Sequence, residues 1–180
     1  VVILNKPYNV LSQFTDERHS GPARETLKRF IPMPGLYPAG RLDLDSEGLL
    51  VLTDDGGLNH RLSHPTNKVT KTYWVQVEGA PHDHDLQPLR EGAELRDGVC
   101  RPARCALMET PWLLWPREPP IRVRQHLPTQ WISVTIAEGR NRQVRRMCAA
   151  VGFPALRLIR YRVGSWTIDG LEPGGWRQVV

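Results

Sequence analysis

The chain has few cysteines and no long hydrophobic run. Its three cysteines, Cys100, Cys105 and Cys148, are an odd number without paired spacing, which argues against a disulfide framework and for free thiols in a reducing compartment. No stretch approaches the roughly 20 apolar residues that a membrane-spanning helix needs, and no signal-peptide core is visible. We therefore expect a cytoplasmic protein.

Lysine is also scarce, whereas arginine is abundant. Of the 24 basic residues only 4 are lysine, and the formal net charge is +5. A planar guanidinium group pairs with phosphate and stacks on bases, so we expect a polyanionic partner such as RNA. Clustered charge is often only a solvated face, but the repulsion within such a cluster is easier to understand if phosphates neutralise it. Between residues 139 and 162 no acid interrupts a series of arginines: Arg140, Arg142, Arg145, Arg146, Arg157, Arg160 and Arg162.

The hydrophobic spacing predicts an α+β protein with a mainly antiparallel sheet. The predicted strands are residues 1–4, 49–53, 72–78 and 131–136. In the third of these Tyr73, Val75 and Val77 share one face, because side chains alternate along a strand. Since the chain begins with Val1 rather than Met, and already as a strand, we expect the natural N-terminus to lie further upstream.

Short helices are predicted between the strands. One begins at Pro22 and runs to Ile31, and the last begins at Asn141 as its N-cap and ends at Gly152. Further short helices contain the pairs Leu58 and Leu62, and Leu86 and Leu89. Five prolines make residues 110–129 an irregular excursion between strands. The last helix has an apolar stripe formed by Val144, Met147, Cys148 and Val151.

Two patterns imitate metal sites, and neither is convincing. Asp43, Asp45, Glu47, Gly48 and Asp54 have the spacing of a calcium-binding loop, but residues 36–40 cannot form the helix that should enter it. Zinc would need convergent ligands, whereas the histidines and cysteines are scattered along the chain. We expect no metal ion.

The most informative segment is Gly40-Arg41-Leu42-Asp43, at a turn before a buried strand. Taken alone, Asp43 is more simply explained as a turn residue or one half of an ion pair. The chain also offers Tyr73 on an alternating strand and arginines at a turn that opens a helix, residues 138–147. A carboxylate, a phenol and a helical arginine suit an enzyme that flips a base, holds it and attacks its sugar.

Five segments together resemble the bacterial ribosomal RNA pseudouridine synthases of the RsuA type. They are residues 5–7, 40–56, 68–73, 138–147 and 158–164, and they occur in the order expected for that family. The excursion at residues 111–128 matches no motif of the family. The resemblance implies the pseudouridine synthase fold, with one catalytic domain over residues 1–180 arranged as two lobes around one RNA-binding cleft.

The resemblance also implies chemistry and site residues. A uridine is isomerised to pseudouridine without a cofactor, Asp43 attacks the anomeric carbon or deprotonates the neighbouring sugar carbon, and Tyr73 stacks on the flipped base. Arg145 pairs with Asp43, Arg41 fills the space left by the base, and Val163 packs against Tyr73. Candidates for phosphate contacts are Lys6, Lys71, Arg140, Arg142, Arg146, Arg160 and Arg162.

Likeness to a short member of the family indicates ribosomal RNA, and within it the large-subunit RNA, as the partner. Nothing indicates an interface, so we expect a monomer. Two other functions stay open: a non-catalytic RNA-binding module of the same fold, and a base-flipping hydrolase acting on DNA. A hydrolase would release a base, whereas a synthase leaves the chain length and mass of its substrate unchanged.

Overall fold

The computed structural model describes all 180 residues and divides into two compact units. The first unit combines residues 1–69 with residues 161–180, and the second is the continuous segment 70–160. The expected arrangement of two lobes around one cleft stays a prediction.

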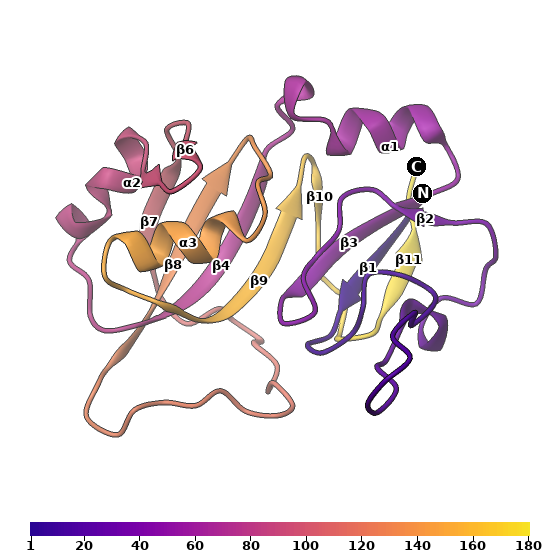
Figure 1. Ribbon diagram of the computed structural model, residues 1–180, viewed down its shortest axis with the longest axis horizontal. Coiled ribbons are helices and arrows are strands. Elements are labelled where there is room, and N and C mark those ends of the chain that lie inside the picture. Colours follow the sequence, from indigo (N-terminus) through magenta and orange to yellow (C-terminus); the bar gives the residue numbers. More distant parts are fainter. The chain divides into compact units, whose positions relative to one another are not determined.

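The first unit is built on β3 (Glu47–Thr53), in which all seven residues are buried. β1 (Val2–Lys6) pairs antiparallel with β3 and also with β11 (Trp176–Gln178), so the two ends of the chain lie side by side (Figure 1). Smaller elements complete the unit. They are β2 (Tyr37–Pro38), a 3-10 turn (Leu27–Arg29), α1 (Gly56–Ser63), a second 3-10 turn (Pro65–Asn67), and β10 (Trp166–Thr167), which pairs with the end of β9 (Ala155–Val163).

The core of this unit follows the alternation of its strands. Side chains from β1 and β3 pack on one face with residues of the segment between them, including Leu27, Ile31 and Leu42. Leu42 therefore belongs to the hydrophobic core, although it lies in a loop. α1 begins where the Asp55 carboxylate accepts hydrogen bonds from the amides of Gly57 and Leu58.

The second unit contains a sheet with the strand order β9-β4-β8-β7, to which β9 contributes its first six residues. β4 (Lys71–Glu78) and β7 (Arg104–Met108) both pair antiparallel with β8 (Thr129–Ile136). Separate from this sheet is a small hairpin of β5 (Glu94–Leu95) and β6 (Gly98–Val99). The helical elements are a 3-10 turn (Asp83–Leu86), α2 (Gln87–Glu91) and α3 (Gln143–Ala150).

α3 packs across one face of the second unit's sheet (Figure 1). Its buried Val144, Met147 and Cys148 join a core that also contains Tyr73 and Val75 of β4. The alternation predicted for residues 72–78 and the helical stripe after residue 143 are thus confirmed, and so is the α+β class. None of the helices has the length and hydrophobicity that crossing a bilayer requires.

One predicted helix and one predicted N-cap are wrong. The helix expected from Pro22 to Ile31 is only a single 3-10 turn, because the amides and carbonyls before it bond to another segment: Leu11 N–H donates to Glu25 C=O and Leu27 N–H to Gln13 C=O. The N-cap of α3 is Arg142 in the left-handed conformation, not Asn141, and no side chain caps that helix.

Candidate functional site

Asp43 lies in a loop whose backbone is fixed on both sides. The buried hydroxyl of Ser12 accepts a hydrogen bond from Leu42 N–H at 3.1 Å and donates one to Leu42 C=O at 2.8 Å. On the other side Ser46 N–H donates to Asp43 C=O at 3.1 Å. The half-buried side chain of Asp43 is thus carried by a segment that is anchored in the core by Leu42.

The turn after β1 supports the same loop. Asn9 N–H donates to Leu44 C=O at 2.8 Å, and Asn9 itself adopts a positive φ of 65°, which asparagine tolerates better than most residues. Lys6 is fully buried, and its ammonium group donates to the carbonyls of Pro7 and Val10 at 2.8 and 2.7 Å. The expectation that Lys6 contacts phosphate is therefore wrong, since its charge is used inside this turn.

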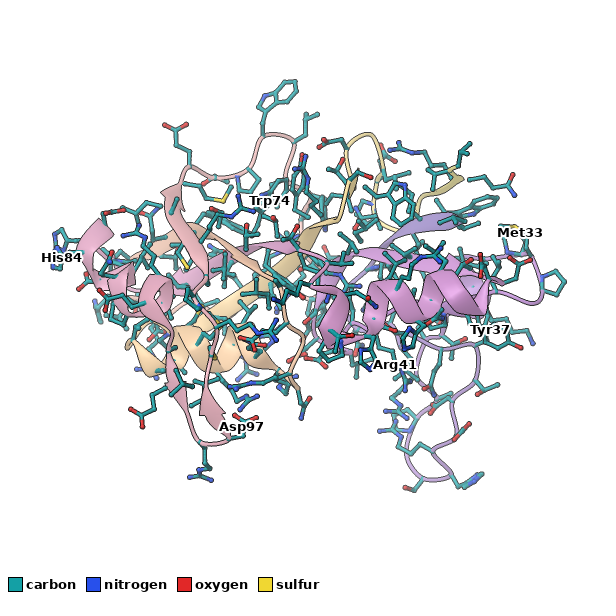
Figure 2. The ribbon with its side chains drawn as sticks, turned by 90° about the horizontal axis from the view of Figure 1, so that it is seen from above. Met33, Tyr37, Arg41, Trp74, His84 and Asp97 are labelled. Atoms are coloured by element: carbon teal, nitrogen blue, oxygen red, sulfur yellow. The ribbon has the colours of Figure 1, made fainter.

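Arg41 has an exposed side chain at the start of the Asp43 loop (Figure 2). Its guanidinium group hydrogen-bonds to the side chain of Gln13. Gly40 precedes it with φ of 81°, a conformation that a larger residue would adopt only under strain. The guanidinium group of Arg41 is thus held by one side chain of its own unit while it stays exposed to solvent.

In the second unit, Tyr73 and Arg145 belong to elements that pack together. Tyr73 lies opposite Val134 in the β4–β8 ladder and is only 8% exposed. It shares its core with Val144, the residue before Arg145 on α3. Arg145 is half-buried, so it lies at the margin of the face that α3 presents to the sheet.

Lys71, the first residue of β4, is half-buried beside the turn that precedes α3. A side chain at Gly139 would bring its Cβ to 3.6 Å from the Lys71 ammonium nitrogen. Burial lowers the pKa of Lys71, and the positive charge of Arg160 lowers it further. Arg160 is itself only 3% exposed, so the expectation that it contacts phosphate from the surface is wrong.

Arg140 and Arg146 both form ion pairs with Asp97. Asp97 lies in the turn of the β5–β6 hairpin (Figure 2). Arg146 donates Nη1 to Oδ1 at 2.7 Å and Nη2 to Oδ2 at 3.3 Å, whereas Arg140 Nη2 lies 3.2 Å from Oδ1 and donates to Gly98 C=O. The hydrogen bonds from Arg146, together with the charges of both arginines, lower the pKa of Asp97. The sequence analysis did not identify Asp97. The only feature of the sequence that could have indicated it is an acidic residue in a two-residue turn.

A cavity of about 480 Å³ lies beside this ion-pair cluster. Arg142, whose side chain is exposed, contributes to it from the N-cap of α3 with φ of 50°. Three arginines against one acid make this cavity positive, as a phosphodiester would require. Its lining residues are Arg96, Asp97, Asn141, Arg142 and Arg146.

Val163 is buried in the first unit, opposite Trp166 in the β9–β10 pair. Asp43 and Arg41 belong to the same unit, whereas Tyr73 and Arg145 belong to the other. The pairing of Asp43 with Arg145 and the contact of Val163 with Tyr73 stay predictions.

One group of potential metal ligands does come together. The ligand atoms of His82, His84 and Asp85 all lie within 4.8 Å of one another. However, Asp85 already accepts a hydrogen bond from His82 N–H at 2.7 Å, which caps the following 3-10 turn. The two imidazole rings are stacked nearly parallel, at 7°, and a nitrogen of each lies 3.6 Å from an oxygen of Asp85. The cluster is therefore explained by helix capping.

Comparison with known proteins gives a consistent result. Residues 1–150 match the family described as RNA pseudouridylate synthase. Ribosomal large subunit pseudouridine synthase E of Vibrio vulnificus is 55% identical over 179 residues, which are 99% of this chain and 74% of the relative. The protein of the same name from Xanthomonas axonopodis pv. citri is 58% identical over 173 residues, covering 96% and 90%. A crystal structure of a pseudouridylate synthase superimposes with a TM-score of 0.77 at 29% identity, covering 99% of this chain and 69% of that one.

Proposed function

This chain belongs to the family of RNA pseudouridylate synthases, and we propose that its substrate is one uridine of bacterial large-subunit ribosomal RNA. The observation that carries the proposal is the 54–58% identity, over nearly the whole chain, to proteins named for that substrate. We place the reaction in the cytoplasm, where ribosomal RNA is made, and expect the protein to work as a monomer.

The reaction exchanges one glycosidic bond for another. The bond from N1 of uracil to C1′ of ribose breaks, and a bond from C5 to C1′ forms. The proton that C5 loses balances the proton that N1 gains, so no oxidant, water or cofactor is consumed. The enzyme has to flip the nucleotide out of its stack, hold the detached base and return it in a new orientation.

Asp43 is proposed as the catalytic carboxylate. It either attacks C1′ or removes a proton from C2′, and both routes need an ionised carboxylate in a fixed position. The hydrogen bonds of Ser12 to both backbone groups of Leu42 support such fixation. We propose that Arg145 pairs with Asp43 in the closed site and keeps it ionised there, because an opposite charge offsets the cost of desolvation.

Tyr73 is proposed to stack on the flipped uracil and to accept the proton from C5. Its ring is held by the core that β4, β8 and α3 form, so its orientation is set before RNA arrives. Val163 closes on the other side of the ring. Proton transfer from C5 requires the phenol oxygen within hydrogen-bond reach of that atom, and the proposed stacking would bring the two together.

Arg41 and the positive cavity are proposed to hold the RNA. Arg41 is exposed and enters the stack in place of the flipped nucleotide, which offsets an unstacking cost of a few kcal/mol. Lys71 and Arg142 contact phosphates, and so do Arg140 and Arg146, although Asp97 neutralises part of the charge of these two arginines. Such contacts position the RNA without reading its sequence.

The test is carbodiimide-based mapping of pseudouridine by primer extension on ribosomal RNA. Cells lacking the protein receive the wild type, Asp43→Asn, or Asp54→Asn as a control in an exposed carboxylate of the same segment. We expect one stop in large-subunit RNA, restored by the wild type and by Asp54→Asn but not by Asp43→Asn. A stop restored by Asp43→Asn would remove Asp43 from the chemistry. If no variant restores a stop, the RNA-binding module becomes the better description.

A further inference from the structure

The connection between β7 and β8, residues 109–128, exposes four large apolar side chains, which are Trp112, Leu113, Val123 and Leu127. Trp112 is 88% exposed and Leu113 is 77% exposed. The other five tryptophans of the chain are buried or half-buried. This connection has no helix or strand, and Figure 1 shows it as the long loop that leaves β7 and returns to β8. Exposed aromatic side chains next to other apolar ones mark interaction sites, since water solvates them poorly.

The backbone that displays Trp112 is strained. Leu114 N–H donates to Pro111 C=O at 3.3 Å, which closes a β-turn with Trp112 and Leu113 at its two central positions. Leu113 has φ of 61°, a left-handed conformation that normally selects glycine or asparagine at this place in a turn. A leucine held there costs on the order of 1 kcal/mol. Strain that presents an exposed ring indicates a use for that ring.

The part of the connection that follows the turn is tied to itself and to other segments of the second unit. The guanidinium group of Arg157 lies 5.5 Å from the centre of the Trp115 ring. Arg117 donates to the carbonyls of Pro119 at 2.8 Å and of Leu156 at 3.4 Å. At the far end, Gly79 N–H donates to Pro128 C=O at 2.7 Å. The connection that carries Trp112 is thus tied down at residues 115, 117 and 128, which lowers the entropy cost of ordering it around a ligand.

The same connection has a small excess of positive charge, which favours an anionic ligand over a cationic one. The connection carries three arginines against two acids. Arg122 is exposed, and Arg124 is exposed with only a 3.6 Å ion pair to Glu78. Proteins bind single-stranded nucleic acid with exposed aromatic rings, which stack on the bases, and with exposed guanidinium groups, which pair with the phosphates.

We propose that Trp112 stacks on an unpaired base of the RNA substrate outside the catalytic site, with the adjoining phosphates next to Arg122. This inference rests on the proposed function, because that function supplies the RNA. The contact recognises unpaired RNA near the modified uridine and adds affinity without taking part in bond making.

The decisive comparison uses three substitutions of one residue. Trp112→Ala removes the ring, Trp112→Leu keeps an apolar side chain without a ring, and Trp112→Phe keeps a smaller ring. The probe is a large-subunit ribosomal RNA fragment that contains the modified uridine, and a fully paired RNA duplex of equal length serves as the comparison ligand. Tyr37→Ala is the matched control, since Tyr37 is an exposed aromatic residue outside the connection (65%; Figure 2).

We expect Trp112→Ala and Trp112→Leu to bind the fragment about 5- to 100-fold more weakly, as loss of one base–aromatic stack predicts. Trp112→Phe restores most of the affinity, and duplex binding and Tyr37→Ala stay at the wild-type level. Unchanged affinity in Trp112→Ala would overturn the proposal. Equal losses in Trp112→Leu and Trp112→Phe, or full affinity in Trp112→Leu, would exclude stacking of the ring on a base.

Acrylamide quenching of tryptophan fluorescence tests the wild type itself. Trp112 is the most accessible of the six tryptophans, so the RNA fragment should protect a quenchable component that is absent from Trp112→Phe. If quenching is the same with and without bound RNA, the proposed contact does not form.

The outcome is separable from that of the proposed function. Under saturating RNA the chemical rate of Trp112→Ala should equal that of the wild type, because only binding is weakened. A wild type that binds RNA through Trp112 but forms no pseudouridine would reject the proposed function and keep this contact. If the wild type forms pseudouridine but bound RNA leaves Trp112 unprotected, the proposed function is kept and the Trp112 contact is rejected.

Discussion

Asp97 accepts hydrogen bonds from both terminal nitrogens of Arg146, at 2.7 and 3.3 Å. The pair ties the turn of the β5–β6 hairpin to the first half of α3, although the two residues lie 49 positions apart. Arg145 is the residue before Arg146 on that helix. The hairpin therefore helps to hold the helical turn that carries a proposed catalytic arginine.

The first prediction concerns the pH dependence of this tie. The pKa of Asp97 is held below its ordinary value of 3.8, chiefly by the hydrogen bonds from Arg146. A lowered pKa means that the pair stabilises the fold fully above that ordinary value and is lost as the pH falls through the lowered pKa. As the pH is lowered from 6 to 2, the melting temperature of Asp97→Asn should thus fall less steeply than that of the wild type. Parallel curves would show that the pair contributes nothing to stability.

Replacing Arg145 by lysine should impair the enzyme without inactivating it. Lysine keeps the positive charge but lacks the planar fork that fixes a carboxylate in direction. We expect single-turnover rates about 10- to 100-fold below the wild type, with RNA affinity nearly unchanged. Arg104→Lys, in an exposed arginine of β7, is the control. Full activity of Arg145→Lys would mean that Arg145 does not orient Asp43.

Tyr73→Phe keeps the ring in its core and removes only the hydroxyl group. Stacking on the base and folding should survive, whereas the chemical step should slow by about 100-fold or more if the phenol is the base. Single-turnover kinetics with saturating RNA separate the two effects. A variant that turns over at the wild-type rate would assign proton removal at C5 to another group.

The thiols should resist alkylation in the native state. Burial raises the pKa of Cys148 to about 12 and that of Cys105 to about 11, and it raises the pKa of Cys100 as well. Only the thiolate reacts, so iodoacetamide at pH 8 should leave the folded protein unmodified for minutes and label three sites in urea. Mass spectrometry counts the adducts. Rapid labelling of folded protein would show that its core opens easily.

Leu113→Gly should stabilise the protein. Glycine accepts φ of 61° without the clash of a Cβ, and little apolar contact is lost because Leu113 is exposed. We expect a gain in the free energy of unfolding of up to about 1 kcal/mol. Leu113→Ala keeps the Cβ and should show no gain. Urea denaturation distinguishes the two, and equal stabilities would mean that the turn is not strained.

The strands that could be predicted are those whose apolar residues alternate or run together, such as residues 72–78 and 49–53. β9 was missed because Arg157 and Arg160 interrupt its apolar residues, yet both are buried. The guanidinium group of Arg157 lies over the Trp115 ring, 42 positions earlier, and no local sequence pattern predicts such a partner. The false helix after Pro22 failed for the same reason, since its backbone bonds to residues 11 and 13.

For the site, short motifs identified the candidate residues but not how their charges are used. Lys6 and Arg160 looked like phosphate contacts because basic residues usually face water, and each proved to be buried. Arg146 is exposed in part, but Asp97 already occupies its fork. Short motifs indicate which residues can take part in a reaction. The residues that pair with their charges come from distant parts of the chain, and a motif does not contain them.

The pairing of β1 with β11 has a consequence for synthesis on the ribosome. Val2 lies opposite Gln178, so β1 cannot complete its pairing with β11 until residues 176–178 have been translated. The continuous second unit, residues 70–160, can fold while that wait continues. A nascent chain would thus acquire the half that contains Tyr73 and Arg145 before it completes the half that contains Asp43. Removing residues 176–180 should leave the early half intact and the later one unfinished.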